Sequence, residues 1–163
     1  MLDQIREFLS SLGGGDDRSS ATDASEPDVA AVALFYHVIG ADGVVDEVEA
    51  QTLRNMISEE YAGSAKSAEA LLKAGEEADR ESVDLYAFTS VLNRSLGPDG
   101  KTHFIELLWR LAYADGHRHE LEDHVVWRIS DLMGVSSRDR VLARQRALRD
   151  AGIEDEGDSD GDS

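Results

Sequence analysis

The chain has 163 residues, no cysteine, and 34 acidic against 16 basic residues, which gives a net charge of −18. The lack of cysteine excludes disulfides, thiol catalysis and cysteine-based zinc sites. The excess of carboxylates opposes binding to nucleic acid or anionic lipid, which reward clustered Lys and Arg. No apolar run approaches the roughly 20 residues of a membrane span. We therefore expect a cytoplasmic protein that does not insert directly into a membrane.

The two ends of the chain differ in composition from the part between them. An amphipathic helix is predicted over residues 1–12, because apolar residues recur there at helical spacing. A flexible linker is predicted over residues 13–27, and a disordered acidic tail over residues 153–163, because both have too few large apolar residues to offset the entropy of ordering. The apolar residues of the N-terminal helix are Leu2, Ile5, Phe8, Leu9 and Leu12.

The central part, residues 28–152, is predicted to be one all-α domain. Its apolar residues recur three and four positions apart, without the sustained alternation of a β-strand. The pair Gly97-Pro98 is expected to separate two helices, since Pro is favoured at the first position of a helix. The result is a compact bundle of about seven helices. They are predicted at residues 28–41, 47–61, 65–79, 83–95, 99–114, 120–133 and 137–151.

An internal duplication emerges when the chain is shifted by 73 positions against itself. Ala41-Asp42-Gly43 then falls on Ala114-Asp115-Gly116, and the acids that follow each triplet also coincide. Two duplicated helical hairpins with Ala-Asp-Gly turns are predicted, and each hairpin has an apolar face that the other can cover. The matching acids are Glu47 with Glu120 and Glu49 with Glu122. The matching apolar pairs are Leu34 with Leu107, Val38 with Leu111, Val48 with Leu121, Leu53 with Val126 and Met56 with Ile129.

Each predicted turn gathers acidic side chains at the same spacing. In the first turn, Asp46 followed by Glu49 predicts an N-cap and a capping box, and a glycine after each turn Asp predicts a left-handed helix end. His119 stands where the first turn has Asp46 and is a poor N-cap, so capping explains the second turn less well. The candidate metal ligands are Asp42, Asp46, Glu49, Asp115, His119 and Glu122.

Crowded carboxylates repel one another unless a cation or helix amides compensate. Ca²⁺ or Mg²⁺ would suit an all-carboxylate loop, whereas the imidazoles of His117, His119 and His124 would admit Zn²⁺ or another transition metal such as Mn²⁺. The spacing matches neither an EF-hand nor a zinc-protease helix. Metal binding and simple capping with solvated charge both remain open. A hydrolase that uses Glu120 or Glu122 as a base on a metal-bound water is a further alternative.

The duplicated Ala-Asp-Gly turns, each followed by an acidic helix start, resemble the TerB tellurite-resistance family and the related N-terminal region of the DjlA co-chaperone. The resemblance covers roughly residues 28–150. It implies about seven helices, acidic motifs on one surface, divalent-metal binding, and a non-enzymatic part in tellurite and stress resistance with a TerC-like membrane protein as partner. The alternative is a metal-free co-chaperone or assembly module, similar to DjlA, that acts through its N-terminal helix. The acids carried over from the family are Asp42, Asp46, Glu49, Asp115 and Glu122.

Overall fold

The computed structural model describes residues 27–41, 43, 45–60 and 65–153. These residues form seven α-helices and no β-strand, which confirms the all-α prediction. None of the helices in this part of the chain is both long enough and apolar enough to span a membrane. The predicted N-terminal helix, almost all of the linker and almost all of the acidic tail lie outside the described residues. The helices are α2 (Pro27–Ile39), α3 (Glu47–Glu60), α4 (Ala65–Glu81), α5 (Tyr86–Ser95), α6 (Pro98–Ala112), α7 (Glu120–Leu132) and α8 (Ser137–Ala151).

Helix α2 is the centre of the fold. Every residue from Val29 to Phe35 is completely buried, as is typical of a helix that is apolar on all sides. It contacts α3, α4, α5, α6 and α7. The crossing with α4 is close at Gly75, where a Cβ atom would lie 2.4 Å from Cγ1 of Val32. A larger residue at this position would force the two helices apart.

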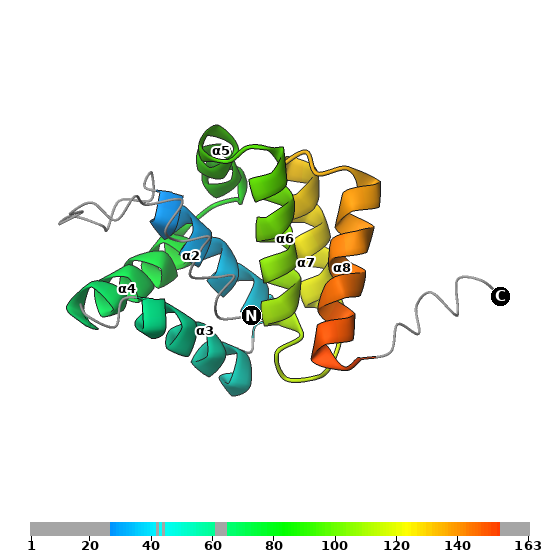
Figure 1. Cartoon of the computed structure of the whole chain (residues 1–163). Helices are drawn as coiled ribbons and strands as arrows, with labels where there is room; N and C mark the ends of the chain where they lie inside the picture. Colours follow the sequence, from blue (N-terminus) through cyan, green and yellow to red (C-terminus); the bar gives the residue numbers. More distant parts are fainter. Residues whose placement is uncertain (1–26, 42, 44, 61–64, 154–163) are drawn as a thin grey trace.

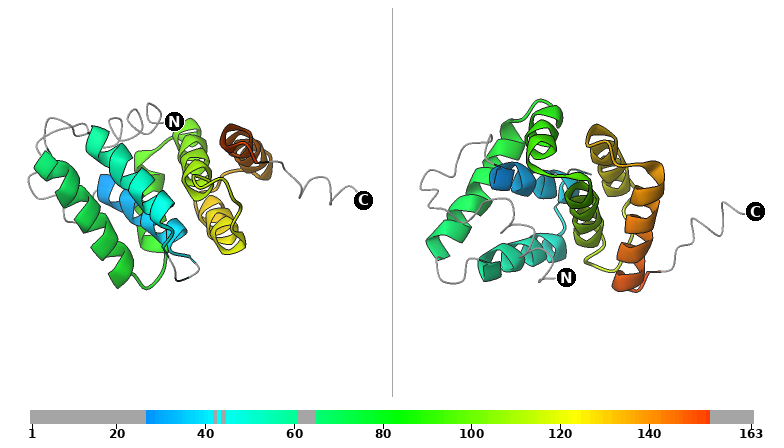
Figure 2. Two further views of the ribbon diagram at one scale, coloured as in Figure 1. Left: turned by 90° about the horizontal axis from the view of Figure 1, so that it is seen from below. Right: turned by 45° about the horizontal axis from the view of Figure 1, so that its top comes forward.

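Five of the remaining helices lie in two groups on either side of α2, and α5 contacts α2 and α7. Figure 1 shows α6, α7 and α8 side by side on one side of α2, with α3 and α4 on the other. Figure 2 shows the same division from below, with α4 and α8 at opposite edges of the molecule. The rings of Phe35 and Phe104, 5.4 Å apart between centroids, join α2 to α6. Trp109 and Tyr113 are completely buried in the core.

Most helix ends follow local signals in the sequence. Oγ of Ser136 accepts the N–H of Asp139 at 3.1 Å and caps α8. At the other end of α8, Gly152 is left-handed with φ of 75°, and the N–H of Ile153 donates to a carbonyl of the last turn. Helix α5 begins at Tyr86 rather than at residue 83. The reason is that Oδ1 of Asp84 accepts the N–H of Tyr86 at 2.8 Å and holds a turn ahead of the helix.

Candidate metal site

The turn between α2 and α3 and the turn between α6 and α7 have the same glycine conformation. Gly43 and Gly116 have φ of 84° and 83°, in the left-handed region that favours glycine. The N–H of Gly43 donates to the carbonyl of Gly40 at 3.0 Å, and the N–H of Gly116 donates to the carbonyl of Tyr113 at 2.9 Å. The predicted left-handed glycines are therefore confirmed in both turns.

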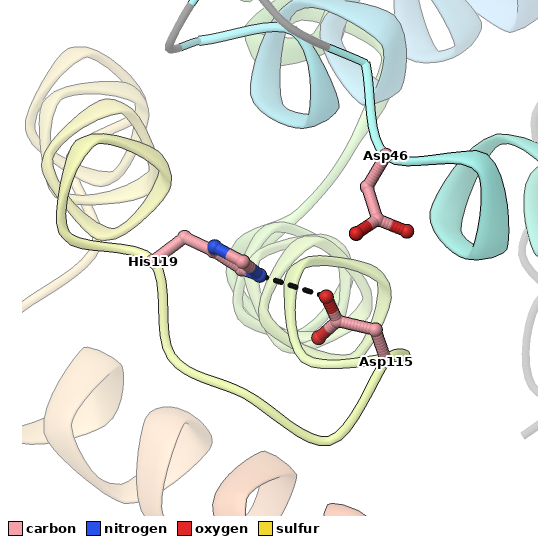
Figure 3. A group of neighbouring side chains, drawn as sticks. All are labelled: Asp46, Asp115 and His119. Carbon is pink, nitrogen blue, oxygen red and sulfur yellow. Dashed lines mark hydrogen bonds and ion pairs between the residues drawn. The ribbon is translucent and has the colours of Figure 1, made fainter.

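The two turns bring five of the six predicted ligands together. Asp46, Asp115 and His119 each offer a ligand atom within 4.8 Å of the others, and the same holds for Glu49, His119 and Glu122. Figure 3 shows the side chains of Asp46, just before α3, and His119, just before α7, both directed toward the side chain of Asp115. The first hairpin thus contributes two side chains to this cluster and the second contributes three.

Asp46 caps its own helix. Its Oδ1 accepts the N–H of Val48 at 2.8 Å and the N–H of Glu49 at 3.3 Å. The other half of the predicted capping box does not form, because neither carboxylate oxygen of Glu49 accepts a hydrogen bond from a backbone N–H of the described residues. The group beside this carboxyl is instead the carboxyl of Glu122. The capping explanation therefore accounts for Asp46 but not for Glu49.

Glu49 and Glu122 are the buried carboxyl groups of the cluster. They expose 0% and 1% of their surface, although they lie on different hairpins. Burial raises the pKa of Glu49 to about 10, and the negative charge of Glu122 and of the two nearby aspartates adds to the effect. A buried carboxylate is costly unless a proton or a cation compensates its charge. The orphaned oxygens of Glu49 are thus suited to a positively charged ligand.

His119 lies between the two sets of carboxylates. Its Nε2 atom is 2.9 Å from Oδ2 of Asp115 and 3.9 Å from Oε2 of Glu49. Burial alone would lower the pKa of His119, but the hydrogen bond with Asp115 and the surrounding negative charge outweigh it and raise the pKa. Burial alone would raise the pKa of Asp115, but His119 and the backbone N–H of His117 outweigh it and lower the pKa. A protonated imidazole next to an ionised aspartate is therefore the favoured state without metal.

Because His119 belongs to both groups, they are not two independent sites. An imidazole nitrogen offers one lone pair and binds one ion at a time. The two groups thus share His119 and together contain four carboxylates and one imidazole, contributed by both hairpins. Each group combines two carboxylates with the imidazole of His119, so there is no separate group made of carboxylates alone.

Other residues considered in the sequence lie apart from this site. His117 and His124 are exposed and belong to neither group. His37 is near Asp79, with 2.6 Å between Nδ1 and Oδ1, and also belongs to neither group. Asp42 lies outside the described residues.

One bond that holds the second turn was not predicted from the sequence. The hydroxyl of Tyr113 donates to Oδ1 of Asp123 at 2.8 Å and so links the end of α6 to the start of α7. Burial raises the pKa of Tyr113, and the charge of Asp123 adds to this, so the phenol remains a neutral donor. The first hairpin has Gly40 and Ala50 at the equivalent positions and lacks this bond. This difference between the two repeats is the feature of the sequence from which the bond could have been predicted.

The structure therefore defines a class of protein: an all-α bundle in which two hairpin turns share one carboxylate and imidazole cluster. The family model described as Tellurite resistance protein TerB matches residues 28–145. This match covers more than two thirds of the chain, and the chain belongs to the TerB family. The same comparisons found no matching curated protein and no matching solved structure.

Proposed function

We propose that this member of the tellurite-resistance family is a non-enzymatic, cytoplasmic stress protein that binds one divalent cation in the shared cluster and presents the surrounding acidic surface to a protein partner. The observation that carries the proposal is the side chain of Glu49, which is completely buried, lies 3.9 Å from Nε2 of His119 and accepts no hydrogen bond from a described residue. Helix capping gives no reason for this orientation. A cation between the hairpins does.

The ligand set favours a transition metal over calcium. Asp46, Glu49, Asp115 and Glu122 supply oxygen, which Ca²⁺, Mg²⁺ and Mn²⁺ accept, while His119 supplies a nitrogen that suits Zn²⁺ and Mn²⁺ better. When bound, the cation supplies two positive charges that offset the carboxylates. The chain's own residues hold it from both hairpins, so binding stabilises the contact between α3 and α7.

The surface around the cluster fits a basic partner with apolar side chains. Val48 and Leu121, each one residue before a buried glutamate, expose 52% and 53% of their surface. Glu47 and Glu120 are exposed beside them. Acidic and apolar groups in one region complement Lys, Arg and aliphatic side chains. A cytoplasmic loop of a TerC-like membrane protein is the partner we propose.

Thermal unfolding of the full chain tests metal binding. With Mn²⁺ or Zn²⁺ at a hundredfold excess over the dissociation constant, the free energy of unfolding should rise by about 2.7 kcal/mol relative to chelator-treated protein, and Ca²⁺ should act more weakly. Glu49→Gln should abolish the rise. Glu47→Gln changes an exposed acid two residues away and should retain it. If no divalent ion raises the unfolding temperature of the unmodified chain, the cluster is a structural turn only.

A further inference from the structure

Helix α8 carries a charge opposite to that of the chain as a whole. It has five arginines and two aspartates, a net charge of +3, whereas the whole chain has −18. It packs on α6. Figures 1 and 2 both show it at an edge of the molecule. A basic helix at the edge of an acidic protein calls for an explanation.

Three of the arginines are used within the fold. Arg140 and Arg144 lie over tryptophan rings, 4.9 and 5.9 Å from the ring centroids. Nε of Arg146 donates to Oε1 of Glu106 at 2.9 Å and holds α8 against α6. These contacts account for the side of α8 that faces the bundle.

The other two arginines, Arg138 and Arg149, lie on the opposite side of the helix. Together with Val141 and Leu142 they form a surface that we call the α8 outer face. Arg138, Leu142 and Arg149 are four and seven positions apart and so share one side of the helix. Val141 and Leu142 expose 37% and 40% of their surface. Both arginines are exposed, and neither forms an ion pair with a described residue.

The most acidic segment of the chain follows this helix directly. Residues 154–163 contain six acids and no base. Ile153 packs against the core, so the segment starts at the foot of α8. Ten residues span at most about 33 Å when extended, and α8 is about 22 Å long, so the segment can reach Arg138. Carboxylates beside a helix C-terminus are unfavourable unless cations are near, which favours their placement over the arginines.

We propose that residues 154–163 occupy the α8 outer face, with their carboxylates in exchanging contacts with Arg138 and Arg149. The covalent connection gives the segment a local concentration in the millimolar range, which a separate acidic molecule must exceed. The segment thereby covers the basic surface and keeps it from acidic partners, including the acidic face of a second copy. This contact is independent of the metal site.

Paramagnetic relaxation in the full chain tests this placement. Because the chain has no cysteine, Ser163→Cys provides a single position for a nitroxide label. The label should reduce the amide signals at the start of α8, near Arg138. These amides lie at the opposite end of α8 from Ile153, where the segment begins. The reduction should disappear in Arg138→Glu/Arg149→Glu. It should persist in Arg54→Glu/Lys73→Glu, a matched pair of exposed cations on α3 and α4.

The outcomes are distinct. A reduction that is independent of protein concentration and is lost in 1 M salt, where the Debye length is about 3 Å, supports the proposal. A reduction seen only when labelled and isotope-enriched copies are mixed would assign the α8 outer face to a second copy and overturn it. No reduction at the start of α8, or one that survives Arg138→Glu/Arg149→Glu, would also overturn it.

Discussion

The two hairpin turns share the conformation of their glycine but differ in their side-chain hydrogen bonds. Gly43 and Gly116 differ by one degree in φ. Yet Asp46 in the first turn caps its helix, while its counterpart His119 makes no cap and bonds Asp115 instead. The second turn gains a hydrogen bond from Tyr113 that the first turn lacks. The shared feature is thus the geometry that places a buried glutamate seven residues after the turn aspartate, and the local contacts around it are free to differ.

The interactions that fold each turn are thus distinct from the contact that joins the two hairpins. The caps and glycines are local and serve each hairpin alone. Glu49 and Glu122 face each other across the hairpins, at a cost in stability that neither turn requires. Substitutions at Glu49, at the turn glycines and at Asp46 test these contributions one at a time.

The largest effect is expected for Glu49→Gln in metal-free protein. The pKa of Glu49 is about 10 in the folded state and about 4.3 when unfolded, so across that interval only the folded state keeps the proton. Stability therefore falls as pH rises from about 4 to about 10. Glutamine mimics the protonated group and removes this loss. At pH 8 the variant should be more stable by up to about 5 kcal/mol, and at pH 4 the difference should vanish.

Chemical denaturation at the two pH values measures this change. Glu120→Gln, which removes an exposed acid from the start of α7, is the control and should shift stability little. Equal stability of Glu49→Gln and the unmodified chain at pH 8 would mean that the buried carboxylate carries no cost.

Next in size are the turn glycines. Gly43→Ala and Gly116→Ala each place a Cβ in the left-handed region, where open space leaves backbone strain as the only penalty. Each should cost about 1–2 kcal/mol. The two costs should be similar in urea denaturation, because both glycines have nearly the same φ and neither Cβ would meet an atom within 4 Å. A large difference would show that the turns are not equivalent.

A smaller change in stability separates the two roles of Asp46, helix capping and metal binding. Asp46→Ala should lower the stability of metal-free protein by about 1 kcal/mol because the cap is lost, whereas Asp46→Asn keeps a good N-cap and should leave stability nearly unchanged. Both variants should weaken metal binding. Thermal unfolding with and without Mn²⁺ gives both quantities, and unimpaired metal binding in Asp46→Asn would remove this residue from the ligand set.

The smallest effect is expected for deletion of residues 1–12. Metal affinity should be unchanged, because the described ligands all lie between Asp46 and Glu122. Under the proposed function, capture of the membrane partner should also survive. Loss of a captured partner with an intact metal response would instead favour the co-chaperone alternative, in which the N-terminal helix carries the contact.

Much of this architecture could be predicted because its causes are local. Apolar spacing indicated the helices, and the turn glycines and the pair Gly97-Pro98 indicated some of their ends. The orientation of Glu49 could not be predicted in the same way, because the local pattern also fits a capping box. Its burial depends on the approach of Glu122, 73 positions away, which only the packed hairpins bring about. The late start of α5 likewise depends on a side chain that competes with the backbone, Asp84.

Calorimetric titration of chelator-treated protein with Mn²⁺ tests most directly whether both turns hold a single ion. We predict one ion per chain. Glu49→Gln in the first hairpin and Glu122→Gln in the second should each weaken that same binding event. Two ions per chain, with each substitution removing one and leaving the other unaffected, would contradict the account.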